Sequence, residues 1–267
     1  MQNKKKQELL FKAKNNRIIR AAIRPLINHK RIKSTKEFEK SIEAKRLRDL
    51  RNIYRGQRCF IIGNGPSLCT EDLERLHNEV TFAANRIYRI FDDTSWRPDY
   101  YVAFEPEFVS NNIDELVNVK VKKDRFLNYR GYRDNVLNTY WINCTSQFCI
   151  EKESIKSISF SDDISKYVGD GYSVTFTILQ IALYMGFSEI YLLGMDHNKG
   201  DTRTNHYYIE KKTDYNTPTF WDGMEYAYSL AKEHAEKDGK RIINLTRGGQ
   251  LDVFPRMDFD KVVRKDE

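Results

Sequence analysis

An uncharged helix followed by an apolar strand is the feature that most constrains the fold of this chain. Residues 173–185 contain no charged side chain and are mostly apolar, and Gly186 follows them as a helix-terminating residue. Residues 189–193 then form a short apolar run. A helix without a charged face and a wholly apolar strand are typical of a parallel sheet that is covered on both faces. The unit predicts an α/β domain.

Further apolar runs predict the other strands of this sheet. They lie at residues 59–62, 80–84, 100–104 and 241–245, with weaker candidates at 140–142 and 157–160. Helices are expected at residues 70–76 and 222–238. The pattern predicts a single Rossmann-like domain with a mainly parallel sheet over residues 57–260. Residues 197–221 have no clear period, and so long a segment within a compact domain predicts a lid.

The N-terminal segment carries the positive charge of the chain. Residues 1–56 contain 18 Lys and Arg against 5 Asp and Glu, whereas the remaining residues contain 27 against 33. The domain is therefore not expected to bind nucleic acid, because such a groove needs cations on the folded surface. Residues 1–56 are predicted to be a helical extension, with an exposed helix over 34–55. Two interpretations stay open for residues 1–33: contact with an anionic membrane surface, or packing on the domain or on a second subunit of a homo-oligomer.

Polar residues and glycines follow the predicted strands. Because ligands bind at the carboxyl ends of open parallel sheets, these turns predict the site. The turn Gly63-Asn64-Gly65-Pro66-Ser67 follows the first strand, where two glycines permit positive φ and a close approach to a phosphate. The alternative is a tight turn without a ligand. The other turns are Asn85-Arg86, Glu105, Asp196-His197-Asn198 and Arg247-Gly248-Gly249.

Ser173 and Thr175, at the start of the uncharged helix, form a second candidate anion site. Simple N-capping by Ser173 is the alternative. In the predicted lid, His206 has the near-neutral pKa that suits a general base, and a surface histidine without a role is the competing interpretation. His197 is a lesser candidate for catalysis.

The sequence gives little support for a metal site or a cofactor. It contains no CxxC pair, and the side chains of the adjacent pairs Asp92-Asp93 and Asp162-Asp163 diverge, so we expect no metal ion, no cofactor and four free thiols. It also contains neither a run of eighteen apolar residues nor a secretory signal, which predicts a cytoplasmic protein, peripheral on the inner face of the cell membrane if the extension binds lipid.

The order of these motifs resembles two related groups of proteins. GNGPSL, Asn85-Arg86, Phe104-Glu105-Pro106, Gly194-Met195-Asp196 and a later histidine are similar to the motifs of the bacterial sialyltransferases of the Campylobacter type. They are also similar to those of the 6-hydroxymethylpterin diphosphokinase-like group, whose bacterial members often look like glycosyltransferases for surface polysaccharide or flagellar sugars. The likeness covers about residues 58–255.

The resemblance implies a role for each matching residue. Gly63, Asn64, Gly65, Ser67 and Asn85 would contact the nucleotide and its phosphate, Ser173 or Thr175 would assist the phosphate, and Asp196 would shape the nucleotide pocket. Glu105 and Asn198, which depart from the sialyltransferase residues, would lie with Tyr207 near the donor sugar or the acceptor. His206 would remove the proton of the acceptor hydroxyl.

The resemblance implies a GT-A-like variant of the Rossmann-like fold, and the function that it implies is an inverting, metal-independent glycosyltransferase. It would take a sugar from a nucleotide donor, with CMP as one candidate nucleotide, and act on a surface glycan or a lipid-linked acceptor. Two alternatives remain. One is a pterin-type pyrophosphokinase that uses ATP and Mg²⁺, and the other is a non-catalytic nucleotide-binding protein.

Overall fold

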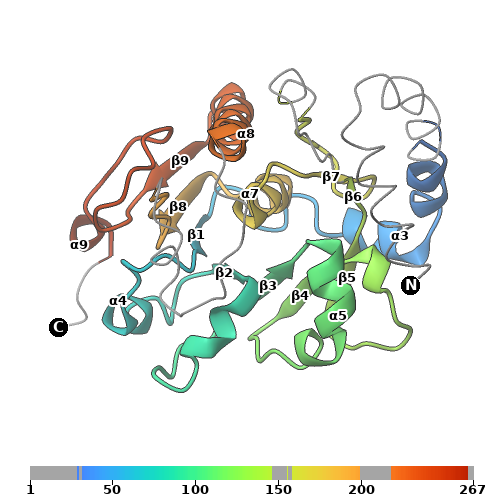
Figure 1. Ribbon diagram of the computed structural model, residues 1–267, viewed down its shortest axis with the longest axis horizontal. Coiled ribbons are helices and arrows are strands. Elements are labelled where there is room, and N and C mark those ends of the chain that lie inside the picture. The colour runs from blue at the N-terminus through green and yellow to red at the C-terminus, as the bar shows by residue number, and fades with distance from the viewer. Residues whose placement is uncertain (1–28, 30–31, 146–154, 156–157, 199–217, 264–267) are drawn as a thin grey trace, which may run out of the picture.

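A seven-stranded parallel sheet forms the centre of the protein. The computed structural model describes residues 29, 32–145, 155, 158–198 and 218–263. The strand order is β5-β4-β3-β2-β1-β8-β9, and every neighbouring pair is parallel (Figure 1). The strands are β1 (Arg58–Ile62), β2 (Thr81–Ala84), β3 (Tyr100–Ala103), β4 (Asp124–Asn128), β5 (Thr139–Ile142), β8 (Glu189–Leu193) and β9 (Arg241–Asn244). The predicted α/β class with a parallel sheet is confirmed.

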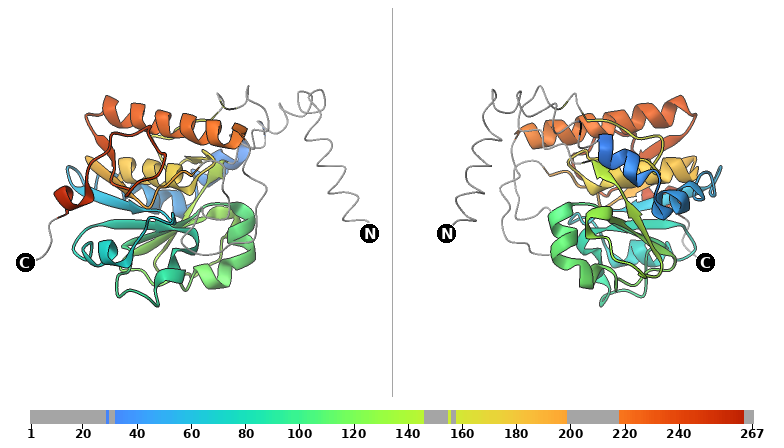
Figure 2. Two further views of the ribbon diagram at one scale, coloured as in Figure 1. Left: turned by 60° about the vertical axis from the view of Figure 1, so that its left-hand side comes forward. Right: turned by 90° about the vertical axis from the view of Figure 1, so that its right-hand side faces the viewer.

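Helices cover both faces of this sheet, as the two views of Figure 2 show. Along β1 the buried side chains alternate, so that Cys59 and Ile61 belong to one core cluster and Phe60 and Ile62 to the other. The first cluster holds α3 (Ile42–Arg48), α7 (Val174–Met185) and α8 (Pro218–Lys237). The second holds α4 (Thr70–Glu74), α5 (Pro106–Leu116) and α9 (Phe259–Val262). The two layers make the sheet a buried one, which explains its apolar strands.

Shorter elements complete the described chain. They are the 3₁₀ helices η1 (Asn85–Ile90) and η2 (Tyr129–Gly131), and a two-stranded sheet of β6 (Cys144–Thr145) and β7 (Val168–Gly169). Residues 158–160, a weak strand candidate, are not in a strand. Among the residues that the structure describes, no helix is both long and apolar enough to cross a membrane.

The second half of the basic extension is part of the packed body. Residues 34–55 were expected to form one exposed helix, but the structure has a short helix at 32–38 followed by α3. Phe38, Ala44 and Leu47 from this stretch are buried in the core cluster of α7 and α8. The burial of these apolar side chains holds the segment on the domain.

The extension also closes the far end of α7. The last carbonyls of a helix have no partner within it. Here the amides of Asn52, Tyr54 and Gly56 donate to the carbonyls of Tyr184 (3.1 Å), Met185 (2.9 Å) and Gly186 (3.2 Å). Residues 52–56 therefore satisfy the C-terminal carbonyls of the helix whose other end lies at the predicted site.

The order in which successive strands are added to the sheet changes side between β1 and β8. From β1 the strands β2 to β5 follow one another outward on one side, and β8 and β9 follow on the other. A crevice opens at the carboxyl ends of strands where the order reverses, and ligands bind there in open α/β sheets. The turns after β1 and β8, residues 63–67 and 194–198, lie at this switch point.

Candidate functional site

The turns after β1 and β8 contact each other through their backbones. The amide of Gly63 donates to the Leu193 carbonyl (2.8 Å), and the amide of Gly65 donates to the Gly194 carbonyl (2.9 Å). The parallel pairing of the two strands thus continues past their ends. This brings residues far apart in the sequence into one small region of the sheet edge.

Gly63 and Gly65 are required here for space. Neither has positive φ, so the expectation that they supply a left-handed backbone is wrong. A Cβ on Gly63 would lie 2.3 Å from the Gly194 carbonyl oxygen, and a Cβ on Gly65 would lie 1.8 Å from Oδ2 of Asp196. Both distances are far below van der Waals contact. Only glycine lets the two turns approach so closely.

Asp196 occupies the centre of the contact. Its side chain is buried, and its carboxylate accepts hydrogen bonds from the Ser67 amide (3.2 Å to Oδ1) and from the Ser67 hydroxyl (2.7 Å to Oδ2). The Ser67 amide, which was predicted to face a phosphate, is therefore paired with a protein carboxylate. A phosphate at this amide would face like charge, whereas a hydroxyl or amino group could donate to the carboxylate.

The backbone of Asp196 is held from the other side. The amide of Gln250 donates to its carbonyl (2.7 Å), and the preceding amide of Met195 donates to the Thr246 hydroxyl (3.0 Å). A Cβ on Gly249 would lie 2.6 Å from the Asp196 carbonyl oxygen. Glycine turns thus pack against Asp196 on two sides and hold its backbone.

Asn64 and Asn85 line the neighbouring strand end. The Asn64 side chain donates from Nδ2 to the carbonyl of Ala84 (3.1 Å). Its Oδ1 is buried and has no hydrogen-bond partner in the part of the chain that the structure describes. Asn85 follows β2 with a φ of 52°, and its carbonyl accepts from the Tyr101 hydroxyl (2.6 Å). A buried acceptor without a donor costs about 1–3 kcal/mol, so Asn64 Oδ1 is suited to a hydroxyl or amino donor.

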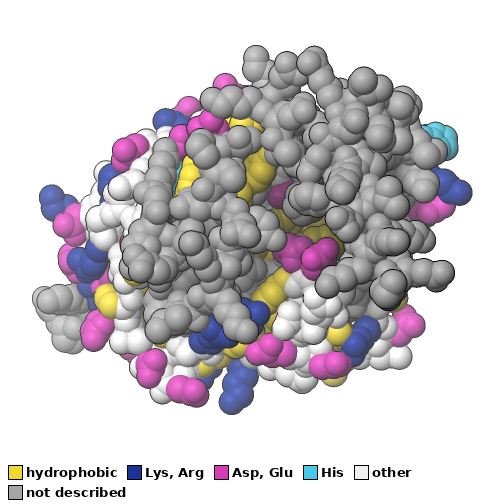
Figure 3. All heavy atoms as spheres, in the orientation of Figure 1, with side chains coloured by type: hydrophobic (Ala, Val, Ile, Leu, Met, Phe, Trp, Pro, Cys, Tyr) yellow, Lys and Arg dark blue, Asp and Glu magenta, His cyan; other side chains and the backbone are white. Residues whose placement is uncertain are grey.

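Glu105 caps the helix that follows β3. Its carboxylate accepts hydrogen bonds from the amides of Glu107 (3.1 Å) and Phe108, and Pro106 occupies the first helical position. These are typical features of a helix N-terminus. Near the middle of the face in Figure 3, acidic side chains lie beside apolar ones, where the chain turns from β3 into α5 in Figure 1. A contact between Glu105 and a sugar stays a prediction.

Ser173 caps α7, as the simpler interpretation of this segment predicted. Its hydroxyl oxygen accepts from the Thr175 amide (3.2 Å) and from the Tyr228 hydroxyl (2.9 Å). The hydroxyl of Thr175 is buried and lies 3.4 Å from the sulfur of Met195. Burial also raises the pKa of Tyr228, which keeps its hydroxyl protonated as a donor. Assistance to a phosphate by Ser173 or Thr175 stays a prediction.

His197 is held by one face of α8. Its side chain is 3% exposed, and Nε2 donates to Oε1 of Glu225 (3.1 Å). Its ring meets Trp221 edge-on, with centroids 4.7 Å apart, and its backbone φ is 53°. Trp221, Glu225 and Tyr228 are spaced four and three residues apart, and this spacing on a helix could have identified them as one face.

The remaining predicted residues divide into two groups. Asn198 is half-buried beside His197. His206, Tyr207 and most of the predicted lid lie outside the described residues. Over the described ranges, no group of three or more His, Cys, Asp or Glu side chains is placed to hold a metal ion.

Arg247, in the turn after β9, is engaged in protein contacts. Its Nε and Nη2 donate to the two carboxylate oxygens of Asp72 (2.8 and 2.9 Å), and Nη2 also donates to Asp260 (3.1 Å). The guanidinium therefore joins α4 to α9. These contacts explain why a cation stands in this turn, since the charge of Arg247 is balanced by two carboxylates of the protein.

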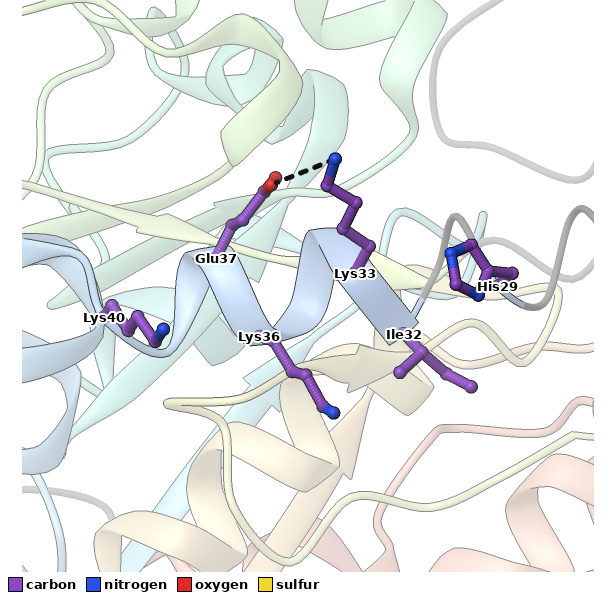
Figure 4. A pocket seen from close by; sticks show the side chains of 6 residues that line it. All are labelled: His29, Ile32, Lys33, Lys36, Glu37 and Lys40. Atoms are coloured by element: carbon purple, nitrogen blue, oxygen red, sulfur yellow. Dashed lines mark ion pairs between the residues drawn. The ribbon is translucent and has the colours of Figure 1, made fainter.

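A hollow of about 370 Å³ lies away from the sheet edge, on the first described helix. Its lining side chains are all exposed, and Lys33 pairs with Glu37 at 3.9 Å. Figure 4 shows these two on one side of the helix, with Ile32 and Lys36 on the other. Because the charged groups do not converge, we do not assign the active site here.

Comparisons with known proteins match this chain to one family and to distant structures. A model of the family described as 6-hydroxymethylpterin diphosphokinase MptE-like matches residues 32–202. The MAf glycosyltransferase from Magnetospirillum magneticum AMB-1 is 15% identical with a TM-score of 0.49, over 85% of this chain and 38% of that one. This chain thus spans less than half the length of that enzyme. Comparison with curated proteins found no match.

The sialyltransferase CstII from Campylobacter jejuni is similar at the same level. Its structure with the substrate analogue cytidine-5′-monophosphate is 15% identical with a TM-score of 0.48, over 76% of this chain and 85% of that one. Its structure with CMP-3FNeuAc is 16% identical with a TM-score of 0.41, over 75% and 85% of the two chains.

Proposed function

The chain belongs to the MptE-like family, which its motifs predicted, and we propose that it is a glycosyltransferase that uses a nucleotide-sugar donor. The observation that carries the proposal is the contact between Asp196 and Ser67 at the switch point of the sheet. The buried carboxylate of Asp196 and the buried Oδ1 of Asn64 are both hydrogen-bond acceptors, so a ligand here needs donor groups. The hydroxyls of a ribose and the amino group of a base are such donors.

This arrangement favours the nucleoside, and not the phosphate, as the ligand of the β1 turn. The phosphate would then bind further along the sheet edge, near the start of α7. We propose that the reaction is inverting and metal-independent, with the departing phosphate stabilised by amide and hydroxyl donors. His206 is proposed as the base that takes the proton from the acceptor hydroxyl.

A pterin-type pyrophosphokinase remains the second candidate, since the family description names that activity. Transfer of diphosphate from ATP normally uses Mg²⁺ held by carboxylates. The two functions therefore differ in their metal requirement. A non-catalytic nucleotide-binding protein is the third candidate.

A thermal-shift panel of CMP, UDP, GDP, ADP and ATP separates these functions. CMP leads the panel because the order of the motifs resembles that of the Campylobacter-type sialyltransferases. A ligand that binds only the folded state raises Tm, so the nucleotide that raises Tm most is the preferred one. Stabilisation by CMP without Mg²⁺ would support the transferase, and stabilisation by ATP only with Mg²⁺ would support the pyrophosphokinase.

Turnover is then measured with the preferred nucleotide sugar and a glycan acceptor. We expect His206→Ala to lower kcat by about 10²–10⁴-fold without loss of nucleotide binding. His234→Ala is the matched control, because His234 is partly exposed on α8 and pairs with Asp162. Full activity of His206→Ala would remove this residue from the mechanism, and binding without turnover would favour the non-catalytic protein.

For residues 1–33 we propose contact with an anionic membrane surface, where lipid-linked acceptors lie. The high Lys and Arg content of residues 1–56 supports electrostatic attraction to such lipids. Sedimentation with vesicles containing phosphatidylserine tests the proposal in the whole chain and in a chain without residues 1–33. Equal binding by the two chains would contradict it.

A further inference from the structure

We infer that His197 and Glu225 are positioning residues that hold the Asp196 carboxylate against Ser67. The consequence for ligand binding rests on the proposed function, because Asp196 is assigned there to the nucleoside. The consequence for the Ser67 amide does not depend on it.

The first observation is the conformation of His197. Its φ of 53° lies in the left-handed region, which residues other than glycine seldom adopt. Such a conformation persists only where the surrounding structure holds it. Here the imidazole is buried, donates to Glu225 at 3.1 Å and packs on Trp221. The side-chain contacts thus hold the turn directly after Asp196.

The second observation is the position of the holding groups. Trp221, Glu225 and Tyr228 share a face of α8, and Tyr228 donates to Ser173 at the start of α7 (2.9 Å). One helix face therefore joins the turn after β8 to the N-terminus of α7. Movement of this face would shift the two parts of the proposed site together.

The third observation is the close packing of the Asp196 carboxylate against the turn after β1. Its Oδ2 accepts from the Ser67 hydroxyl at 2.7 Å and would lie only 1.8 Å from a Cβ on Gly65. A small rotation of the turn at His197 would move the carboxylate away from Ser67. The hydrogen bonds of Ser67 therefore report directly on the state of the His197–Glu225 pair.

The experiment measures amide hydrogen exchange of the full-length chain at single residues. We expect Glu225→Ala and His197→Asn to speed exchange of the Ser67 amide about tenfold, relative to core amides such as Leu179. Asn tolerates the left-handed backbone, so His197→Asn removes the anchor and keeps the turn accessible. Glu233→Ala, on the exposed side of α8, is the matched control and should leave Ser67 unchanged.

Glu225→Gln is the milder variant for use if Glu225→Ala does not fold, and it should speed the same exchange to a smaller extent. A merely structural role would lower Tm and speed the exchange of Ser67 and Leu179 equally. Folded variants in which Ser67 exchanges as in the wild type, or no faster relative to Leu179, would overturn the inference.

Nucleotide binding extends the test. With the nucleotide that stabilises the wild type, we expect Glu225→Ala to raise Kd about tenfold, and Asp196→Asn to add little in the double variant, because both act on one contact. Additive effects would contradict the inference. If the wild type binds no nucleotide, the proposed function fails, while the exchange of Ser67 still decides the role of the pair.

Discussion

The carboxylate of Asp196 accepts hydrogen bonds from both the amide and the hydroxyl of Ser67, a residue 129 positions earlier in the chain. The contact joins the turns after β1 and β8 at the point where the order of the sheet reverses. It leaves the amide of Ser67 paired within the protein. The turn that was predicted to bind a phosphate is thus built around a carboxylate.

Asp196→Asn tests the contribution of this contact to stability. An amide at this position can accept from the Ser67 backbone but loses a charged acceptor for the hydroxyl. We expect the free energy of unfolding to fall by about 1–3 kcal/mol in urea denaturation. Asp252→Asn, an exposed change in the segment after β9, is the control and should stay within about 0.5 kcal/mol of the wild type. Equal stability of the two variants would count against the buried contact.

Gly65→Ala tests whether space or backbone conformation requires the glycine. The added Cβ would lie 1.8 Å from the Asp196 carboxylate, and we expect a loss of about 3 kcal/mol or more. Gly239→Ala provides the contrast, since its Cβ would meet nothing within 4 Å but its φ is 68°. That strain costs about 1 kcal/mol. Thermal unfolding of both variants measures the difference, and similar losses would exclude the steric explanation.

Much of the sheet could be predicted because buried parallel strands are continuous apolar runs. The runs at residues 59–62, 189–193 and 241–245 correspond closely to β1, β8 and β9. The strand β4 was missed, since it begins with Asp124 and Arg125 and only its second half is buried. A charged, half-exposed start hides a strand from a hydrophobicity pattern.

The site was predicted less well, because its contacts depend on register. Nothing local to Ser67 indicates that Asp196 will pair with it, since the pairing follows from the alignment of β1 with β8. Glu105 was interpreted as a ligand contact, and its capping of α5 was missed together with that helix. The apolar positions Val109, Ile113 and Leu116 have the spacing of an amphipathic helix and follow Pro106, and this pattern could have identified α5.

Gln180→Leu tests a buried hydrogen-bond network that joins the middle of α7 to Ser161 and Gly169. The Gln180 Oε1 accepts from the amides of Ser161 (3.0 Å) and Gly169 (2.8 Å), and Nε2 donates to the Gly169 carbonyl (3.0 Å). Leucine leaves these groups buried without partners, so we expect a loss of about 3 kcal/mol in urea denaturation. Gln57→Leu is the exposed control. A loss below about 0.5 kcal/mol for Gln180→Leu would show that the network is dispensable.

Arg247→Lys tests the link between α4 and α9. Lysine cannot make the two parallel hydrogen bonds to Asp72, whose side chain is only 5% exposed. We expect a loss of about 1 kcal/mol and faster proteolytic cleavage near α9. Arg133→Lys, where both partners of the ion pair are exposed, is the control. Unchanged cleavage at α9 would mean that the guanidinium does not hold this helix.

Glu74 makes the stability of the protein depend on pH in the acid range. Hydrogen bonds from the hydroxyl of Thr94, from His77 and from Ser95 lower its pKa from 4.5 to about 2. As the pH falls, the unfolded chain takes up the proton first. The stabilisation is therefore complete above pH 4.5 and is lost as the pH falls toward 2.

Glu74→Gln should remove this dependence. At pH 6 we expect the variant to be less stable than the wild type by less than about 1 kcal/mol, because the carboxylate is partly exposed and solvent weakens its contacts. At pH 3 the difference should shrink, since the wild type has begun to lose the same stabilisation. Urea denaturation at both pH values measures it, with Glu71→Gln on the exposed side of α4 as the control. A difference of equal size at pH 3 and pH 6 would show that the charge of Glu74 does not stabilise the fold.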